Sequence, residues 1–213
     1  MKKICTLFFV SFLYLFCFSV AFATDVDVVK NGNYILDGST EYTNGRLQIK
    51  QIHNKDIQGE KFIFYFDVMR GSETQTPKVT RYSNFATINK KDGKITGVLD
   101  LETKKLEFAF DGDKINVVCS GFFPKDFEGT YTFAYGDFEL TQPMVNAFLE
   151  TLPPTMTSLT KVNRPYKIEL ASDKVKRGST MYYSAKAINL NTKKVFARYL
   201  ITEDLKQVIL ENK

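Results

Sequence analysis

The residue types that carry acid–base and nucleophilic chemistry are scarce in this chain. Its 213 residues include one histidine and three cysteines. A Cys–His hydrolase would have to bring His53 and Cys119 together with an orienting carboxylate such as Asp56. Cys119 stands in the run Val-Val-Cys-Ser, which carries no local signature of a cysteine hydrolase. We therefore expect Cys119 to pack as a small apolar side chain, and we predict that the protein is not an enzyme.

Metal and cofactor chemistry are equally poorly supported. Asp111-Gly112-Asp113 has the acidic spacing of a calcium loop, but Lys114 and Ile115 interrupt the pattern that an EF-hand needs. The same residues suit a hairpin turn better. The chain also lacks a glycine-rich phosphate loop, a dinucleotide fingerprint and a serine elbow. We predict no catalytic residues, no metal site and no cofactor.

The N-terminus has the pattern of an export signal. Two lysines precede the uncharged stretch 4–23, which ends in Ala-Phe-Ala. This predicts a signal peptide over residues 1–23 that is cleaved after Ala23. The alternative is an uncleaved membrane anchor, because the stretch is long enough to span a bilayer. Either way the remainder is expected outside the cytoplasm, in the periplasm, secreted or associated with the cell envelope. Nucleic acid is then a poor partner, and no second membrane span is expected.

The first part of the exported chain reads as seven or eight short β-strands joined by tight turns. Asn-Gly and Asp-Gly pairs suit hairpins because their central residues need positive φ. Hairpin-linked strands are antiparallel, so residues 24–140 are predicted to form an antiparallel β-barrel or sandwich. The clearest alternating runs are 46–53, 62–67, 106–110, 115–119 and 130–135. The turn pairs are Asn31-Gly32, Asn44-Gly45, Asp92-Gly93, Asp111-Gly112 and, before Asp137, Tyr135-Gly136.

One run is apolar on both faces at its start. Within 62–67, three phenylalanines alternate with Ile63, Tyr65 and Asp67. Such a strand is expected to be central and covered from both sides. The phenylalanines either fill the core or line a cavity for an apolar ligand, and the sequence leaves both readings open.

The remainder, residues 141–213, is predicted to be a helix followed by a small antiparallel sheet. Thr141 can cap the helix over 141–152, and Pro143 suits its first turn. The helix has one apolar face, so it should pack on one face of the sheet as an α+β unit. The chain as a whole is then mainly β, with two domains or one continuous fold. The predicted strands of the second part are 166–170, 181–190, 195–202 and 207–210.

Charge is divided unevenly between the two parts. Residues 24–160 hold 15 basic and 19 acidic side chains, whereas 161–213 hold 12 basic and 5 acidic ones. A basic face for an anionic partner, such as lipid headgroups, wall polymer or an acidic protein, would explain this. The alternative, which needs no partner, is that the basic part packs against its acidic neighbour or is simply solvated. Candidate contacts for an anionic partner are Lys174, Lys176, Arg177, Lys193 and Lys194.

Two similar phrases open the first and last strands of the predicted barrel: Gly-Asn-Tyr at 32–34 and Gly-Thr-Tyr at 129–131. Together with the export signal and the hairpin-linked strands, they make residues 28–138 resemble the small exported β-barrels of the lipocalin and bacterial lysozyme-inhibitor kind. Tyr34 stands where lipocalins have tryptophan, and Cys119 is alone where many lysozyme inhibitors have a disulfide. The resemblance therefore implies an architecture and carries over no ligand or target residues.

These observations favour an exported, non-catalytic binding protein that holds a small apolar ligand or a partner protein. The alternative is a surface-interaction protein of the cell envelope that uses a basic C-terminal face.

Overall fold

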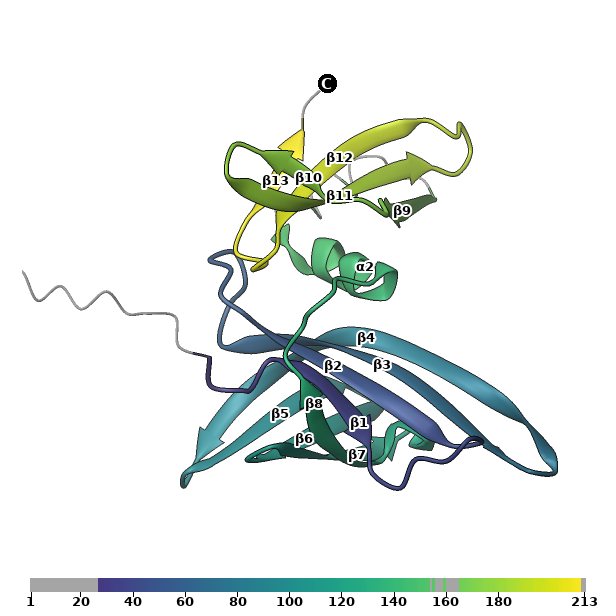
Figure 1. The fold of residues 1–213 in the computed structure, drawn as a ribbon. Helices are drawn as coiled ribbons and strands as arrows, with labels where there is room; N and C mark the ends of the chain where they lie inside the picture. Colours follow the sequence, from purple (N-terminus) through teal and green to yellow (C-terminus); the bar gives the residue numbers. More distant parts are fainter. Residues whose placement is uncertain (1–26, 154, 156–158, 160–164, 212–213) are drawn as a thin grey trace, which may run out of the picture.

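The computed structural model describes residues 27–153, 155, 159 and 165–211. The predicted signal peptide, with Cys5 and Cys17, lies outside the described residues. The chain folds into a closed eight-stranded antiparallel barrel, then one helix and a small antiparallel sheet (Figure 1). The predicted mainly β class is confirmed, and the first part is a barrel and not a sandwich. The barrel strands are β1 (Gly32–Leu36), β2 (Asn44–Ile52), β3 (Lys61–Ser72), β4 (Gln75–Lys91), β5 (Lys94–Leu101), β6 (Lys104–Asp111), β7 (Lys114–Gly121) and β8 (Gly129–Tyr135).

The C-terminal part begins with helix α2 (Gln142–Thr151), as the sequence predicts. Pro143 lies in the first turn of α2, where a missing N–H is tolerated. Thr141 is the N-cap residue, but its buried hydroxyl makes no cap hydrogen bond, so the predicted capping by its side chain is wrong. The sheet that follows contains β9 (Tyr166–Leu170), β10 (Val175–Arg177), β11 (Thr180–Asn189), β12 (Val195–Thr202) and β13 (Val208–Glu211). Its order is β10-β11-β12-β13, and β9 also pairs with β11.

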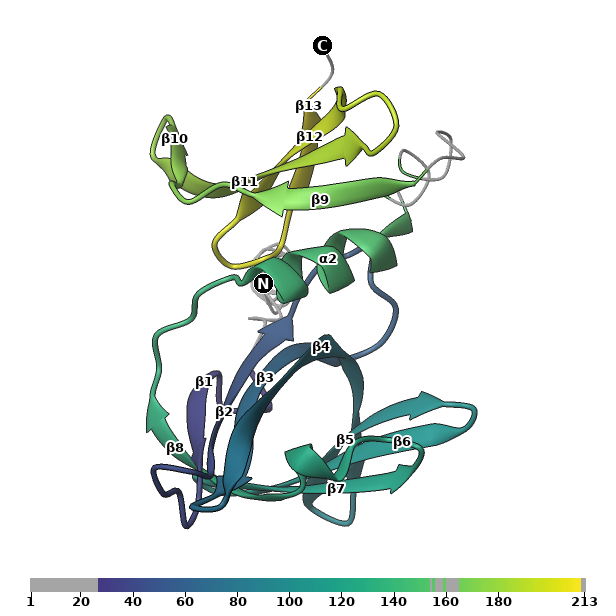
Figure 2. The ribbon, with the colours of Figure 1, turned by 90° about the vertical axis from the view of Figure 1, so that its right-hand side faces the viewer.

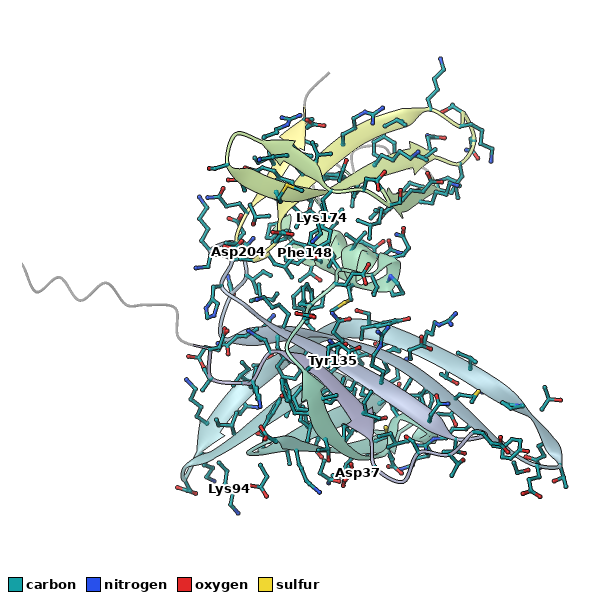
Figure 3. All side chains as sticks on the ribbon, in the orientation of Figure 1. Asp37, Lys94, Tyr135, Phe148, Lys174 and Asp204 are labelled. Carbon is teal, nitrogen blue, oxygen red and sulfur yellow. The ribbon has the colours of Figure 1, made fainter. Side chains whose placement is uncertain are left out.

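The molecule has three layers. Helix α2 lies between the barrel wall and the C-terminal sheet, and Figure 2 shows the same arrangement from the side. The labelled ring of Phe148 sits in this middle layer (Figure 3). Phe148 is fully buried and stacks on Phe85 of the barrel wall, with ring centroids 6.2 Å apart. Residues of the wall, the helix and the sheet thus share a second hydrophobic core outside the barrel.

Strand β3 contributes to both cores, which confirms the prediction of a strand covered from both sides. Its phenylalanines at 62, 64 and 66 point into the barrel and are fully buried there. Ile63 and Tyr65 point outwards, and both are buried in the core beneath α2. The two apolar faces of this run therefore have separate partners.

The two Gly-x-Tyr phrases do open the first and last strands of the closed sheet. β1 pairs with β8, with Leu36 opposite Tyr131. Gly32 has φ +141° and Gly129 has φ +142°, in a region that favours glycine. A Cβ on Gly32 would lie 2.6 Å from the carbonyl oxygen of Tyr135, and one on Gly129 would lie 2.6 Å from Leu36 Cδ1. The barrel can close at this seam because both positions lack a side chain.

Two of the five predicted turn pairs form hairpin turns. The other three do not, since Gly32 opens β1, Tyr135 ends β8 before the connection to α2, and Asn44-Gly45 lies within a strand. Asp92-Gly93 joins β4 to β5 with both residues at positive φ, and Asp111-Gly112 joins β6 to β7. Asn44-Gly45 instead opens β2 and pairs with β3. Gly45 is needed there for close packing, since an added Cβ would lie 3.2 Å from Val68 and 3.3 Å from Leu36.

Candidate functional site

The barrel interior is occupied by the chain's own aromatic rings. Phe108 contacts Phe62 and Phe64, with ring centroids 5.1 and 5.0 Å apart. Phe66 stacks on Phe127 at 4.7 Å and lies 5.7 Å from Tyr131. Each of these rings is at most 1% exposed. An eight-stranded barrel is just wide enough for its own side chains to fill, and these contacts favour the filled-core reading of the phenylalanines.

Cys119 belongs to this interior core. Its side chain is 1% exposed, and burial raises the pKa of its thiol to about 12. A thiol that remains protonated at neutral pH is a poor nucleophile. Cys119 therefore has the environment of a packed apolar residue.

His53 lies far from Cys119 in the topology. His53 follows β2, whereas Cys119 lies near the end of β7, just before the β7–β8 connection. In an up-and-down barrel these two connections are at opposite ends. The Nε2 atom of His53 is 2.7 Å from Asp27 Oδ1. Asp56 lies in the same connection as His53, so the structure brings together the histidine and two carboxylates without the thiol.

The other acidic pair serves the hairpin. Asp111 ends β6, Gly112 has φ +56°, and Asp113 forms an ion pair with Lys30. Within the described ranges, no cluster of three or more His, Cys, Asp or Glu side chains has the arrangement of a metal site.

The five candidate basic residues do not form a single patch. Lys174 forms an ion pair with Glu203 and lies 4.8 Å from the ring centroid of Tyr183, on the side of the sheet that faces the helix. Arg177, on β10, forms an ion pair with Glu211. Two of the five charges are therefore already compensated within the chain.

The other members of the set lie at two ends of the sheet. Lys176 is on β10, which pairs with the first residues of β11. Lys193 and Lys194 lie in the turn after β11. This strand has 10 residues, so the two groups are roughly 30 Å apart along it at ~3.3 Å per residue.

The outer wall of the barrel carries a more compact feature, an open groove of about 380 Å³ over β1–β4. The strand register brings residues 35, 46, 67 and 81 into one outward-facing row, each directly opposite the next. Residues 69 and 79 pair in the neighbouring row. We call this feature the outer-wall groove, defined by Ile35, Arg46, Asp67, Met69, Val79 and Arg81.

The outer-wall groove combines exposed apolar side chains with a net positive charge. Ile35 is 39% exposed and Val79 is 49% exposed. Arg81 donates a hydrogen bond of 3.1 Å from Nε to Asp67 Oδ1. The guanidinium of Arg46 makes no hydrogen bond or ion pair with any residue that the structure describes. The groove therefore has one cation left to meet an anion beside an apolar floor.

Sequence reasoning did not find this groove. Its residues come from four strands, and each one looks like an ordinary outward-facing position of its own strand. Only the register between strands, which alternation does not determine, brings the two arginines to either side of Asp67. The only local signal is that Arg46 and Arg81 each occupy an outward-facing position of their own strand.

The fold is that of a small up-and-down β-barrel with an appended α+β unit. Compared with protein-family models, with curated proteins and with solved structures, the chain gives no significant match. Among the residues described here, no helix has the length and apolar character needed to cross a bilayer.

Proposed function

We propose that this is an exported, non-catalytic binding protein that holds a partner protein on the outside of its barrel. The observation that carries the proposal is the filled interior. The rings of Phe64, Phe66 and Phe108 contact one another and occupy the space in which a lipocalin-like barrel would hold a ligand. Of the two ligand classes that the sequence left open, a partner protein fits a filled barrel better than a small apolar molecule does.

The outer-wall groove is the proposed contact surface. Arg46 would pair with an acidic side chain of the partner, since arginine suits planar recognition of a carboxylate. Apolar side chains of the partner would cover Ile35, Met69 and Val79. Aromatic or aliphatic anchors beside an arginine are typical of the residues that carry binding energy in protein interfaces.

The scattered basic residues support the second candidate, an anionic envelope surface, less well. Lys174 and Arg177 are paired within the chain, and Lys193 lies at the other end of the sheet. A charged surface would need these cations to face one way.

The test is site-specific photo-crosslinking in the exporting cell. A photoreactive amino acid replaces Val79 in the groove or, as the matched control, Val118 on β7, which is 44% exposed on another part of the wall. We expect a discrete crosslinked protein from position 79 that is lost when Arg46→Ala is added, and none from position 118. Equal yields at both positions, or none at either, would refute a partner site in the groove.

Native mass spectrometry of residues 24–213, purified gently from the envelope, tests the competing ligand class. We expect the bare mass of the chain. A reproducible added mass that disappears on denaturation would instead favour a small molecule held in a cavity. The double variant His53→Ala, Cys119→Ala should keep its crosslinks, because neither side chain has a role in the proposed binding.

A further inference from the structure

The last strand of the C-terminal sheet is an edge strand that is apolar except for Glu211, whose side chain forms an ion pair with Arg177. β13 ends the strand order, so along its outer side no other described strand pairs with it. Its sequence is Val-Ile-Leu-Glu, and Ile209 and Leu210 are 39% and 40% exposed on opposite faces. Natural sheets usually protect such an edge with lysine, proline or a bulge.

The opposite edge of the same sheet shows that protection. β10 consists of Val175, Lys176 and Arg177, all three exposed, and Lys174 precedes it. β9, which pairs with another part of β11, carries Lys167 and Glu169. The contrast within one sheet points to β13 as the side that takes up another strand.

Backbone geometry determines which groups β13 offers. Thr202 N–H donates to Gln207 O, and the Gln207 N–H donates to Thr202 Oγ1, so the peptide groups of residue 207 face β12. Peptide groups alternate in direction along a strand. The N–H and C=O groups of Ile209 therefore also face β12, whereas those of Val208 and Leu210 point away from it.

From this geometry we infer that β13 pairs with β13 of a second copy of this chain, antiparallel, with Ile209 opposite its own counterpart. In this register Val208 of each copy lies opposite Leu210 of the other. The two outward-facing residues of each copy then exchange both of their hydrogen bonds, which gives four across the pair. The three opposed positions are all apolar.

The charges along β13 are compatible with self-pairing. Its one charged residue, Glu211, falls opposite Gln207 of the other copy and not opposite itself. Like charges directly opposite each other would be destabilising. Glu211 also keeps its ion pair with Arg177 of its own chain. The two-fold register therefore opposes no like charges along the strand.

The contact is short, which sets the expected strength. A four-residue strand is small against the roughly 1,200–2,000 Å² that stable specific interfaces bury. We therefore expect a reversible dimer that dissociates on dilution. The basic C-terminal parts of the two copies repel each other, so added salt should strengthen the dimer by screening.

The test is sedimentation of the exported chain, residues 24–213, over a wide concentration range. Leu210→Pro removes an outward N–H that the fold itself does not use, as proline is tolerated on the solvent side of an edge strand. We expect the wild type to dimerise with concentration and Leu210→Pro to lose the dimer. Val175→Lys, on the protected edge, is the matched control and should dimerise like the wild type.

A charge-pair exchange tests the register without relying on proline. Ile209→Lys alone and Ile209→Glu alone should each lose the dimer, because each places like charges at the two-fold axis. Their equimolar mixture should regain it. A chain that stays monomeric at every concentration, or a dimer that survives both Leu210→Pro and Ile209→Lys, would overturn the inference. Either result leaves the crosslinks from Val79 unaffected, so this inference and the proposed partner site stand or fall separately.

Discussion

Tyr34 and Tyr131 make the same hydrogen bond at opposite ends of the barrel seam. The Tyr34 hydroxyl donates to the carbonyl oxygen of Lys30 at 2.6 Å, and the Tyr131 hydroxyl donates to that of Phe127 at 3.0 Å. Each acceptor lies four residues before its tyrosine. Because β1 and β8 are antiparallel, the two Gly-x-Tyr phrases fasten the two ends of one strand pair. Burial, with a smaller effect of Asp113, raises the pKa of Tyr34 to about 12, so this hydroxyl stays protonated.

Removing either hydroxyl should destabilise the fold. We expect Tyr34→Phe and Tyr131→Phe each to lower the free energy of unfolding by about 1–3 kcal/mol, because a carbonyl is left without its partner in a buried site. Urea denaturation followed by circular dichroism measures this. Tyr135→Phe is the control, as Tyr135 lies at the same seam but is 46% exposed and should change stability little. Equal losses for all three variants would contradict this role for the hydroxyls.

The filled barrel makes a second prediction about stability. Phe64→Ala and Phe108→Ala should each cost about 3–5 kcal/mol, since each leaves a void among packed rings. Phe122→Ala, at a position that is 84% exposed, should stay within about 0.5 kcal/mol of the wild type. Thermal and urea unfolding of the three variants check this. Small losses at both buried positions would mean that these rings line an open cavity.

Cys119 should not react with a thiol reagent while residues 24–213 are folded. Burial raises the pKa of Cys119 to about 12, so a thiol reagent at neutral pH should modify the folded chain only as fast as it unfolds. Phe122→Cys places a thiol in the exposed connection that follows β7 and should react at once. With a thiol reagent that releases a chromophore when it reacts, absorbance measures the rates of modification of Cys119 and of the Phe122→Cys thiol. Rapid modification of Cys119 in the folded wild type would contradict its assignment to the interior.

Acid should weaken the β7–β8 connection. A hydrogen bond from Lys125, followed by one from the Cys119 backbone N–H, lowers the pKa of Glu128. A lowered folded-state pKa stabilises the fold fully above the range in which an ordinary glutamate titrates, and this contribution is lost as pH falls through the folded-state pKa. Glu128→Gln should therefore be less stable than the wild type at neutral pH, and the difference should shrink on acidification. Urea midpoints as a function of pH measure it.

The control for this pH effect is Glu73→Gln, in the exposed β3–β4 turn at the same end of the barrel. It should parallel the wild type at every pH. A constant difference between Glu128→Gln and the wild type down to strongly acidic pH would show that the carboxylate's charge is not what stabilises this connection.

Alternation in the sequence was enough to predict five strands of the barrel wall, namely β2, β3, β6, β7 and β8. The run 62–67 has two apolar faces, and both find a core. The turn at Asp92-Gly93 was also predictable, because its chemistry is local. β4 was not among the predicted runs, since most of its residues are polar or exposed and show no clear period. Local patterns therefore revealed those strands that bury a full face.

The groove and the free edge depend on relationships that no local pattern contains. Arg46 and Arg81 flank Asp67 only because three strands pair in one register. Lys174, Lys176 and Arg177 were predicted as contacts for an anionic partner, whereas β10 was not predicted as a strand, because a three-residue strand shows no period. Likewise, nothing in the run 207–210 distinguishes an edge strand from a central one.

The helix α2 ties the barrel to the sheet in a way that bears on how this chain can evolve. Ile63, Tyr65 and Phe85 are outward-facing positions of the barrel wall, and they are apolar because the helix covers them. A barrel produced without the residues after 140 would expose these side chains to water as an apolar patch. We therefore expect that neither part folds well alone, because each would expose the apolar surface that the other covers, and that both unfold in a single cooperative transition.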